Sequence, residues 1–347
     1  IFVFVILLAA VQAFAVSDTK TRKLFIVASY SRDNVCGSPQ EAGALKELRS
    51  QGWIEGKKLL VERFYMKTKS RYVTAQAIRQ RGQEALRRIR AFAPDVVLTL
   101  DDNAFREVGL RLAGQPLPVV FSGVNGQPET YNQQHLFMQN RQHPGGNITG
   151  VYEKLYFRRS IEVFASAFPS AKGKKVVALL EDTPTGRAIA IQIRQETPPS
   201  HRIAGIECSI RMVHSWDEYR EQVTGLNRDP QVAALYPVVL QAADADGNLL
   251  TAKEIFTWTV KHNHKPDLAV NYHFAELGYF GGAAVDFDRM GATAGRQIAL
   301  ILDGTPPGEI SIVDAPDYAL VFNLTRTRQL KLDLPTALLT AADHIYR

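Results

Sequence analysis

Short apolar runs alternate with helical patterns along most of the chain. Val96–Leu100 is almost wholly apolar, Val119–Phe121 repeats this pattern, and the spacing between them predicts a helix that ends near Gly114. Strands of a parallel sheet that is covered on both faces have such unbroken runs and are joined by helices. We therefore predict a strand–helix–strand unit of an α/β sheet in this stretch.

The same alternation precedes this unit. Leu24–Ser29 and Leu59–Tyr65 are predicted strands, while Pro39–Ser50 and Tyr72–Phe92 have apolar residues at helical spacing. Together with the strand–helix–strand unit, these elements predict one doubly wound half of the molecule.

The segment that follows breaks the pattern. Gln127–Asn147 is polar and contains Pro and Gly residues that mark turns. Beyond it the alternation resumes, so the predicted fold is α/β, with two doubly wound parallel-sheet lobes. The strands predicted in the second half are Ile148–Tyr152, one within Ile203–Val213, Lys175–Leu180, Val232–Leu240 and Leu268–Asn271, with a last strand and helix in Leu320–Leu330.

Length and composition agree with two lobes. The chain has 347 residues, of which 46% are hydrophobic and 22% charged, as is typical of a globular protein with two domains. The net charge is +6, but the basic residues fall mainly where a helix would face solvent, and aromatic residues are not interleaved with them. We therefore expect no nucleic-acid partner.

The N-terminus has the pattern of an export signal. Ile1–Val11 is apolar and uncharged, and a small-residue site follows it and ends at Ala15. An apolar run of this length is typical of a signal peptide and is too short to span a membrane. We expect residues 1–15 to belong to a signal peptide that is cleaved near Ala15, which would place the mature protein in the periplasm.

Cys36 and Cys208 are the two cysteines. Export would permit a disulfide between them. However, they fall in different predicted lobes, where a bond would prevent the lobes from moving, so we expect two free thiols.

Motifs of common cofactor and enzyme classes are missing from the sequence. It has no Gly-rich phosphate loop and no G-x-S-x-G motif. His262 and His264 could hold a metal ion, but Lys261 and Lys265 beside them oppose a cation. We expect neither a cofactor nor a metal.

Asp101 and Asp102 form an adjacent carboxylate pair at the end of a predicted strand, and three interpretations are open. Asp102 or Asn103 could cap the following helix. The pair could supply an acid and a base to a hydrolase or lyase, although consecutive strand residues point to opposite faces. One carboxylate could instead face a ligand cleft and recognise a cation.

Five segments in order carry a resemblance to a known family. They are Leu48–Lys57, Pro94–Val97, Leu117–Phe121, Gly146–Val151 and Asn323–Leu324. The chain resembles the exported substrate-binding proteins of ABC transporters with the type I periplasmic-binding fold, in the group that includes tryptophan and aromatic amino-acid binders. Its Asp-Asp-Asn and Thr-Gly-Val-Tyr-Glu segments look like a subgroup of unassigned ligand.

The resemblance implies two lobes and a hinge of three crossovers. The lobes would close on a ligand that binds at the strand ends. The implied ranges are 24–124 plus 281–303 for the first lobe, 147–271 plus 309–347 for the second, and 125–146, 272–280 and 304–308 for the crossovers.

The resemblance also implies a non-enzymatic, monomeric protein that captures a small ligand and delivers it to an ABC permease. Docking of the closed form on a membrane signalling receptor is the alternative. Where better-known relatives carry small or hydroxyl residues, this chain has Asp101 and Asp102, which favours a polar ligand with a positive group such as an amine. The predicted lining residues are Tyr30, Ser31, Asp101, Asp102, Asn103, Ser122, Asn125, Glu153, Asp182, Thr183, Tyr236, Tyr272 and Asp286.

Overall fold

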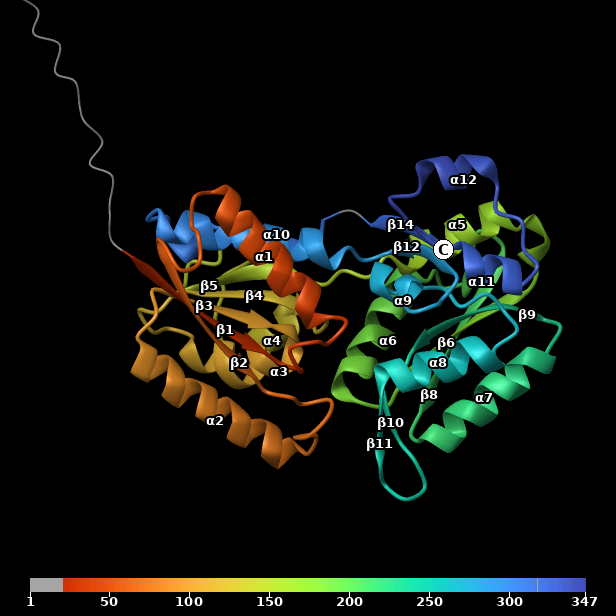
Figure 1. Cartoon of the computed structure of the whole chain (residues 1–347), viewed down its shortest axis with the longest axis horizontal. Coiled ribbons are helices and arrows are strands. Elements are labelled where there is room, and N and C mark those ends of the chain that lie inside the picture. The colour runs from red at the N-terminus through yellow and green to blue at the C-terminus, as the bar shows by residue number, and fades with distance from the viewer. Residues whose placement is uncertain (1–20, 317) are drawn as a thin grey trace, which may run out of the picture.

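The molecule has two lobes, each with a mainly parallel sheet between helices (Figure 1). The computed structural model describes residues 21–316 and 318–347, so the predicted signal peptide at 1–15 lies outside the described residues. Within the described part of the chain, no helix is both long and apolar enough to cross a membrane.

The first sheet has six strands, all parallel, in the order β13-β5-β4-β3-β1-β2. Every residue of β3, β4 and β5 is buried, which explains their nearly unbroken apolar sequences. The predicted fold class is therefore confirmed in this lobe. The strands are β1 (Arg22–Ala28), β2 (Leu59–Tyr65), β3 (Val96–Leu100), β4 (Val119–Val124), β5 (Ile148–Tyr152) and β13 (Val313–Asp314).

Helices cover both faces of this sheet. On one face α1 (Gly37–Ser50) packs against α10 (Phe287–Leu302). The two helices approach so closely that a Cβ atom at Gly291 would lie 2.1 Å from the carbonyl oxygen of Gln40, a distance only glycine tolerates. The other face carries α2 (Ala75–Phe92), α3 (Asp101–Ala104), the π-helix η1 (Phe105–Gly109), the 3₁₀ turn η2 (Leu110–Leu112) and α4 (Pro128–Gln134).

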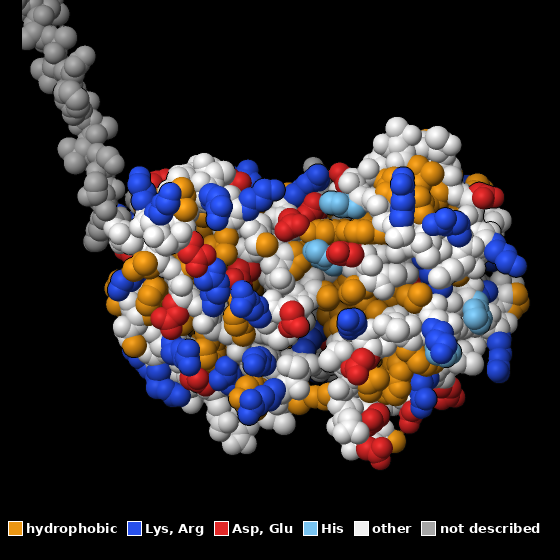
Figure 2. Space-filling view, in the orientation of Figure 1, with side chains coloured by type: hydrophobic (Ala, Val, Ile, Leu, Met, Phe, Trp, Pro, Cys, Tyr) orange, Lys and Arg blue, Asp and Glu red, His pale blue; other side chains and the backbone are white. Residues whose placement is uncertain are grey.

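Most basic residues of α2 face solvent, as the sequence predicts, whereas Arg81 is largely buried and donates to the backbone oxygen of Tyr65. Arg79, Arg87, Arg88 and Arg90 are exposed, and Figure 2 shows Lys and Arg side chains gathered over the first lobe.

The second lobe contains a four-stranded sheet in the order β7-β8-β6-β9, parallel except for β7. Single bridges at Asp267 and Leu268 connect it to a smaller sheet, β12-β14-β15. The strands are β6 (Lys175–Glu181), β7 (Arg202–Ile203), β8 (Ile206–Val213), β9 (Val232–Val238), β12 (Gly281–Ala284), β14 (Ala319–Asn323) and β15 (His344–Tyr346), with a hairpin of β10 (Gln241–Ala243) and β11 (Leu249–Thr251).

Helices surround this second sheet (Figure 1). Phe157, Ile161 and Phe164 recur on one face of a helix and are buried in the core of this lobe. The helices are α5 (Phe157–Ala167), α6 (Pro184–Glu196), α7 (Trp216–Arg228), α8 (Ala252–His262), α9 (Tyr272–Glu276), α11 (Leu324–Gln329) and α12 (Thr336–Ala341), with a short 3₁₀ turn η3 (Pro169–Ala171). A second 3₁₀ turn, η4 (Pro307–Glu309), lies against β5 in the first lobe.

The structure corrects the predicted positions of the crossovers. β5, which was assigned to the second lobe, pairs with β4 in the first sheet, because the polar segment 125–146 forms α4 and turns within one lobe. The chain instead crosses after β5, between β12 and α10, and after β13. Segments 272–280 and 304–308 are therefore not crossovers, and 281–284 belongs to the second lobe.

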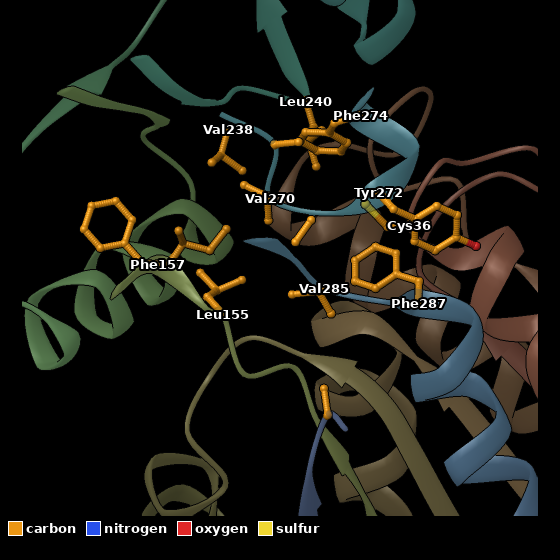
Figure 3. Close-up of a cluster of buried hydrophobic side chains, with 14 of the residues drawn as sticks. Cys36, Leu155, Phe157, Val238, Leu240, Val270, Tyr272, Phe274, Val285 and Phe287 are labelled. Atoms are coloured by element: carbon orange, nitrogen blue, oxygen red, sulfur yellow. The ribbon is translucent and has the colours of Figure 1, made fainter. Parts of the chain in front are cut away.

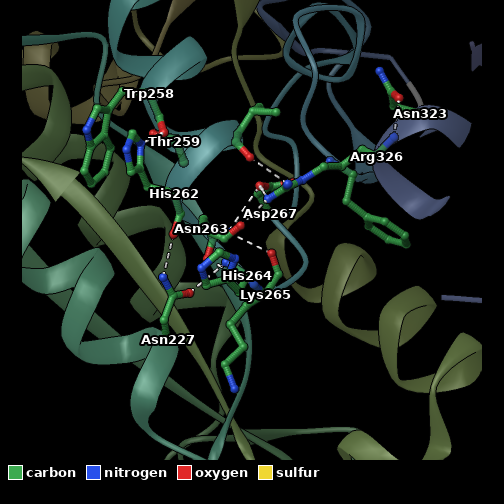
Figure 4. Close-up of polar contacts among 12 residues, drawn as sticks. Asn227, Trp258, Thr259, His262, Asn263, His264, Lys265, Asp267, Asn323 and Arg326 are labelled. Atoms are coloured by element: carbon green, nitrogen blue, oxygen red, sulfur yellow. Dashed lines mark hydrogen bonds and ion pairs between the residues drawn. The ribbon is translucent and has the colours of Figure 1, made fainter. Parts of the chain in front are cut away.

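A buried ion pair fixes α11 to the second lobe. Arg326 donates from Nη2 to Asp267 Oδ2 at 2.6 Å, and both side chains are almost fully buried. Asp267 also accepts hydrogen bonds from the backbone N–H of Phe280 at 2.7 Å and from Asn263 at 3.2 Å, as Figure 4 shows in part. This network joins the C-terminal segment to strands that precede it by more than 50 residues.

We predict that Asp267→Asn lowers the free energy of unfolding by about 3–5 kcal/mol, because it leaves the buried Arg326 charge without its carboxylate partner. Urea unfolding measures this effect. The control is Glu47→Gln, which removes an ion pair to the exposed Arg296 and should cost less than about 1 kcal/mol. Equal losses in the two variants would contradict the prediction.

Candidate ligand-binding site

A small cavity lies between the two lobes, at the carboxyl ends of the parallel strands. Its volume of about 20 Å³ is enough for roughly one water molecule, so the lobes are closed. The lining residues are Tyr30, Cys36, Asp101, Asn125, Glu153, Thr185, Ile189, Val238, Leu240, Val270, Asn271, Phe274 and Phe287.

Asp101 is the first residue after β3 and lies on the cavity wall. Its backbone is in the left-handed region, with φ of +65°, a conformation that Asp tolerates better than most residues and that is often found at functional sites. Gln40 of α1 donates to Asp101 Oδ1 at 3.1 Å and accepts from Ser122 at 2.8 Å. Asp101 Oδ2 is buried and has no hydrogen-bond partner, so one carboxylate oxygen is left for a ligand.

Asn125 and Glu153 follow the next two strands and complete a polar wall. Asn125 Nδ2 donates to Glu153 Oε2 at 3.0 Å, whereas Asn125 Oδ1 is buried without a partner. From α6 of the other lobe, Gln192 donates to the backbone oxygens of Asn125 at 3.0 Å and Glu153 at 3.1 Å. The polar wall is thus held from both lobes.

Burial changes the protonation of both acids. Burial, followed by the neighbouring charge of Asp102, raises the pKa of Asp101 to about 8, against opposing effects of Gln40 and Lys69. Burial, followed by the charges of Asp101 and Asp102, also holds the pKa of Glu153 well above its ordinary value. A positive charge in the cavity would favour the ionised form of both groups.

The second lobe supplies most of an apolar wall. Ile189 of α6, Val238 of β9, Leu240, Val270 and Phe274 of α9 are nearly inaccessible to solvent. Figure 3 shows Leu240 beside Phe274 within a larger apolar cluster that also contains Phe287 and Cys36. These side chains can contact the apolar part of a ligand.

Asn271 is the one amide on this wall. Its Oδ1 atom accepts from the backbone N–H of Phe274 at 3.2 Å and caps α9. Its Nδ2 atom is buried and has no partner, which leaves a neutral donor for a ligand.

An ion pair joins the lobes beside the cavity. Lys69, in the loop after β2, donates to Glu181 Oε1 at 2.9 Å at the end of β6, and both side chains are buried. Glu181 Oε2 accepts from the backbone N–H groups of Leu240 at 2.9 Å and Gln241 at 3.0 Å. Burial alone would lower the pKa of Lys69, but Glu181 keeps it above its ordinary value, so the Lys69 ammonium is charged at neutral pH.

The structure brings four of the predicted site residues, Tyr30, Asp101, Asn125 and Glu153, onto the cavity wall. Asp102 does not line the cavity. It accepts hydrogen bonds from the backbone of Asn125 at 3.3 Å, from Gly126 at 3.0 Å and from the Tyr131 hydroxyl at 2.8 Å. Through these hydrogen bonds, Asp102 holds the loop that follows β4 in place.

The other predicted residues lie outside the cavity lining. Ser122 supports Gln40, and Asn103 bonds Thr68 and Arg106. Thr183 caps α6, Asp286 caps α10, and Asp182 pairs with Arg187. Tyr236 packs on Phe157, Tyr272 donates to Asp288, and Ser31 is partly exposed next to Tyr30.

Sequence reasoning missed most of the apolar wall. Asn271 ends a predicted strand, and this position could have identified it as a lining residue. The prediction instead names the neighbouring Tyr272. Both cysteines are free, as expected, yet Cys36 was not assigned to the cavity. Within residues 21–316 and 318–347, no group of three or more His, Cys, Asp or Glu side chains is arranged to hold a metal ion.

A family model described as ABC transporter substrate binding protein matches residues 41–346. This range includes most of the first lobe, nearly all of the second lobe, and every residue of the cavity except Tyr30 and Cys36. The chain belongs to the ABC transporter substrate-binding protein family.

Solved structures show that this substrate-binding protein shares its two-lobed type I fold with relatives of low sequence identity. An ABC domain from Streptococcus pneumoniae in complex with L-Trp is 17% identical, with 94% of this chain and 100% of that chain covered and a TM-score of 0.71. A conserved domain protein from Vibrio cholerae is 19% identical, with the same coverage and TM-score.

A more distant structure is also similar in fold. The solute binding protein from Rhodopseudomonas palustris BisB5, in complex with 3,4-dihydroxy benzoic acid, is 13% identical, with 84% of this chain and 83% of that chain covered and a TM-score of 0.52. No curated protein sequence matches this chain.

We predict that the ligand-free substrate-binding protein opens as the pH rises. The closed form raises the pKa of Asp101 from 3.8 to about 8, so this group favours closure below about pH 4 and loses that effect as the pH rises through 8. Small-angle scattering at pH 5 and pH 9 should show a larger radius of gyration at the higher pH. Asp101→Asn should reduce this change, whereas the exposed control Asp33→Asn should keep it.

We also predict that Lys69→Met favours the open form at neutral pH, because Glu181 would lose its cation while buried. The closed form should be disfavoured by about 2–5 kcal/mol. A label pair across the cleft would report the longer interlobe distance. Arg187→Met is the control, since its ion pair with Asp182 lies within one lobe; an unchanged distance in Lys69→Met would show that the ion pair does not hold the lobes together.

Proposed function

We propose that this chain is exported, captures a small ligand with a positively charged group between its lobes, and delivers it to an ABC permease. The observation that carries the ligand assignment is the unpartnered Oδ2 atom of Asp101, which is buried on the cavity wall. A buried carboxylate without a cation is costly, and a ligand cation would remove that cost.

Capture by closure of the lobes follows from the polar contacts between them. Gln192 reaches the loops that carry Asn125 and Glu153, and Lys69 reaches Glu181 in the other direction. These contacts form only when the lobes meet, so they stabilise the closed form and help to expel water from around the ligand. Charge interactions in the cleft are stronger once water is excluded.

The relatives support a small-molecule ligand. The pneumococcal structure contains L-Trp and the Rhodopseudomonas structure contains 3,4-dihydroxy benzoic acid. Neither of these two ligands has the positive net charge that we propose for the ligand of this chain. The relatives therefore support only the small size of the ligand. The apolar, uncharged segment of residues 1–11 supports export.

The proposal is tested by a thermal-shift screen of refolded, ligand-stripped protein against primary amines, polyamines, neutral nucleosides and organic acids. Binding at a hundred times Kd should stabilise the protein by about 2.7 kcal/mol, and we expect this effect with cationic compounds.

Asp101→Asn should weaken the binding of such a compound by at least about 10-fold, because a charged hydrogen bond contributes about 1.5–3 kcal/mol. Asp33→Asn, the same change at an exposed position of the same lobe, should leave Kd unchanged. A screen in which only neutral or anionic compounds bind would overturn the cation assignment.

A further inference from the structure

The charge balance around the cavity restricts the ligand beyond the need for a positive group. Lys69 and four carboxyl groups are buried there: Asp101, Asp102, Glu153 and Glu181. Lys69 is bonded to Glu181 and lies 5.1 Å from the centre of the Tyr30 ring. Within residues 21–316 and 318–347, no cationic side chain is bonded to the remaining carboxyl groups, so this part of the cleft has an excess of acidic groups.

Two of the three remaining acidic residues line the cavity in which the ligand is proposed to bind. Asp102 has its oxygens occupied by two backbone N–H groups and the hydroxyl of Tyr131. Asp101 and Glu153 line the cavity itself. The cleft therefore presents two acidic side chains without a cationic partner, and a ligand that binds beside them must carry a positive charge.

The cavity offers no matching site for a ligand carboxylate. Among the described residues that line it, none is Lys, Arg or His. The starts of the nearby helices α6 and α10 are already capped, by the hydroxyl of Thr183 and the carboxylate of Asp286. Among the described residues, the fully buried side-chain donor on the wall that lacks a partner is the neutral Asn271 Nδ2. One neutral amide cannot balance a carboxylate that is buried close to two acids.

We propose that the ligand is a small amine with an apolar body, a net positive charge and no carboxylate. The inference rests on the proposed function and names the substrate class of the same site. The ammonium group binds where the Asp101 Oδ2 and Asn125 Oδ1 atoms lack partners, with Glu153 beside them. The closed cavity of about 20 Å³ is too small for such a ligand. The apolar body therefore packs on the wall formed by Ile189, Val238, Leu240, Val270 and Phe274 when the lobes lie farther apart than in this structure.

Asn271 fits the same ligand class. Its Nδ2 atom can donate to one uncharged acceptor, such as a hydroxyl or carbonyl oxygen, on the far side of the apolar body. An amino acid with the same side chain would bring its carboxylate next to its ammonium group and therefore close to Asp101 and Glu153. The cleft should reject such a zwitterion even when the apolar part is identical.

Matched pairs of compounds test this class directly by calorimetry with the wild-type protein. Each pair is an amine and the amino acid that differs from it by one carboxylate: isobutylamine and L-valine, 3-methylbutylamine and L-leucine, phenethylamine and L-phenylalanine, tryptamine and L-tryptophan. We expect at least one amine to bind, at least 10-fold more tightly than its amino acid. The corresponding acid without the amine, for example 3-phenylpropionate, should not bind.

The same titrations contain a second readout. When an amine binds, Asp101 should ionise and release a proton, which appears as a dependence of the binding enthalpy on the ionisation enthalpy of the buffer. Asp101→Asn should weaken the amine and remove most of this proton release. Glu62→Gln, at a partly exposed position in β2 away from the cleft, should change neither.

The outcomes distinguish an error in the ligand class from an error in the proposed binding site. If amino acids bind as tightly as their amines, or more tightly, and Asp101→Asn weakens them, the ligand class is wrong while capture of a cationic group between the lobes stands. If amines bind but Asp101→Asn leaves their affinity unchanged, the proposed site fails as well. Absence of binding by every amine in the panel overturns the inference.

Discussion

The closed structure depends on how two acids are accommodated between the lobes. Asp101 and Glu153 are almost fully buried where the two lobes meet, and neither has a cationic side chain bonded to it. Desolvation disfavours their charged forms, which is why burial is the largest cause of the raised pKa values. The closed lobes are thus stable either with these groups protonated or with a cation supplied from outside, and this condition connects ligand binding to closure.

Lys69 shows that an internal cation does not remove this constraint. Its ammonium is committed to Glu181, whose second oxygen is fixed by two backbone N–H groups. The ion pair therefore acts across the lobes without neutralising Asp101 or Glu153. One set of groups, Lys69 and Glu181, therefore holds the lobes together, while the acids that face the cavity make closure depend on their protonation or on a ligand cation.

The fold was largely predictable because its signal is local. The runs that became β3, β4 and β6 are apolar along almost their whole length, and parallel strands buried on both faces require this pattern. The crossovers were not predictable in the same way. Whether Ile148–Tyr152 pairs with β4 or starts another sheet depends on long-range hydrogen bonds, and a polar segment rich in Pro and Gly is equally compatible with a hinge or with a turn inside one lobe.

Several polar residues of the candidate site were predictable from the sequence, whereas its apolar residues were not. Strand ends located Asp101, Asn125 and Glu153, because the carboxyl ends of parallel strands gather at one edge. The apolar wall was missed since Val238, Val270 and Phe274 look like ordinary core residues in sequence. Only the second lobe's position against the first turns them into a cavity lining.

The adjacent pair Asp101 and Asp102 shows why a single role could not be assigned from sequence. The two side chains diverge, so Asp102 binds the loop after β4 while Asp101 turns towards the cavity. Asp102 still acts on its neighbour, because its charge adds to burial in raising the Asp101 pKa. The pair therefore combines a structural acid, which fixes the loop that carries Asn125, with an acid that is poised to ionise when a cation arrives. Replacing Asp102 would disturb both the position of Asn125 and the protonation of Asp101, so the proposed cation site depends on the pair as a unit.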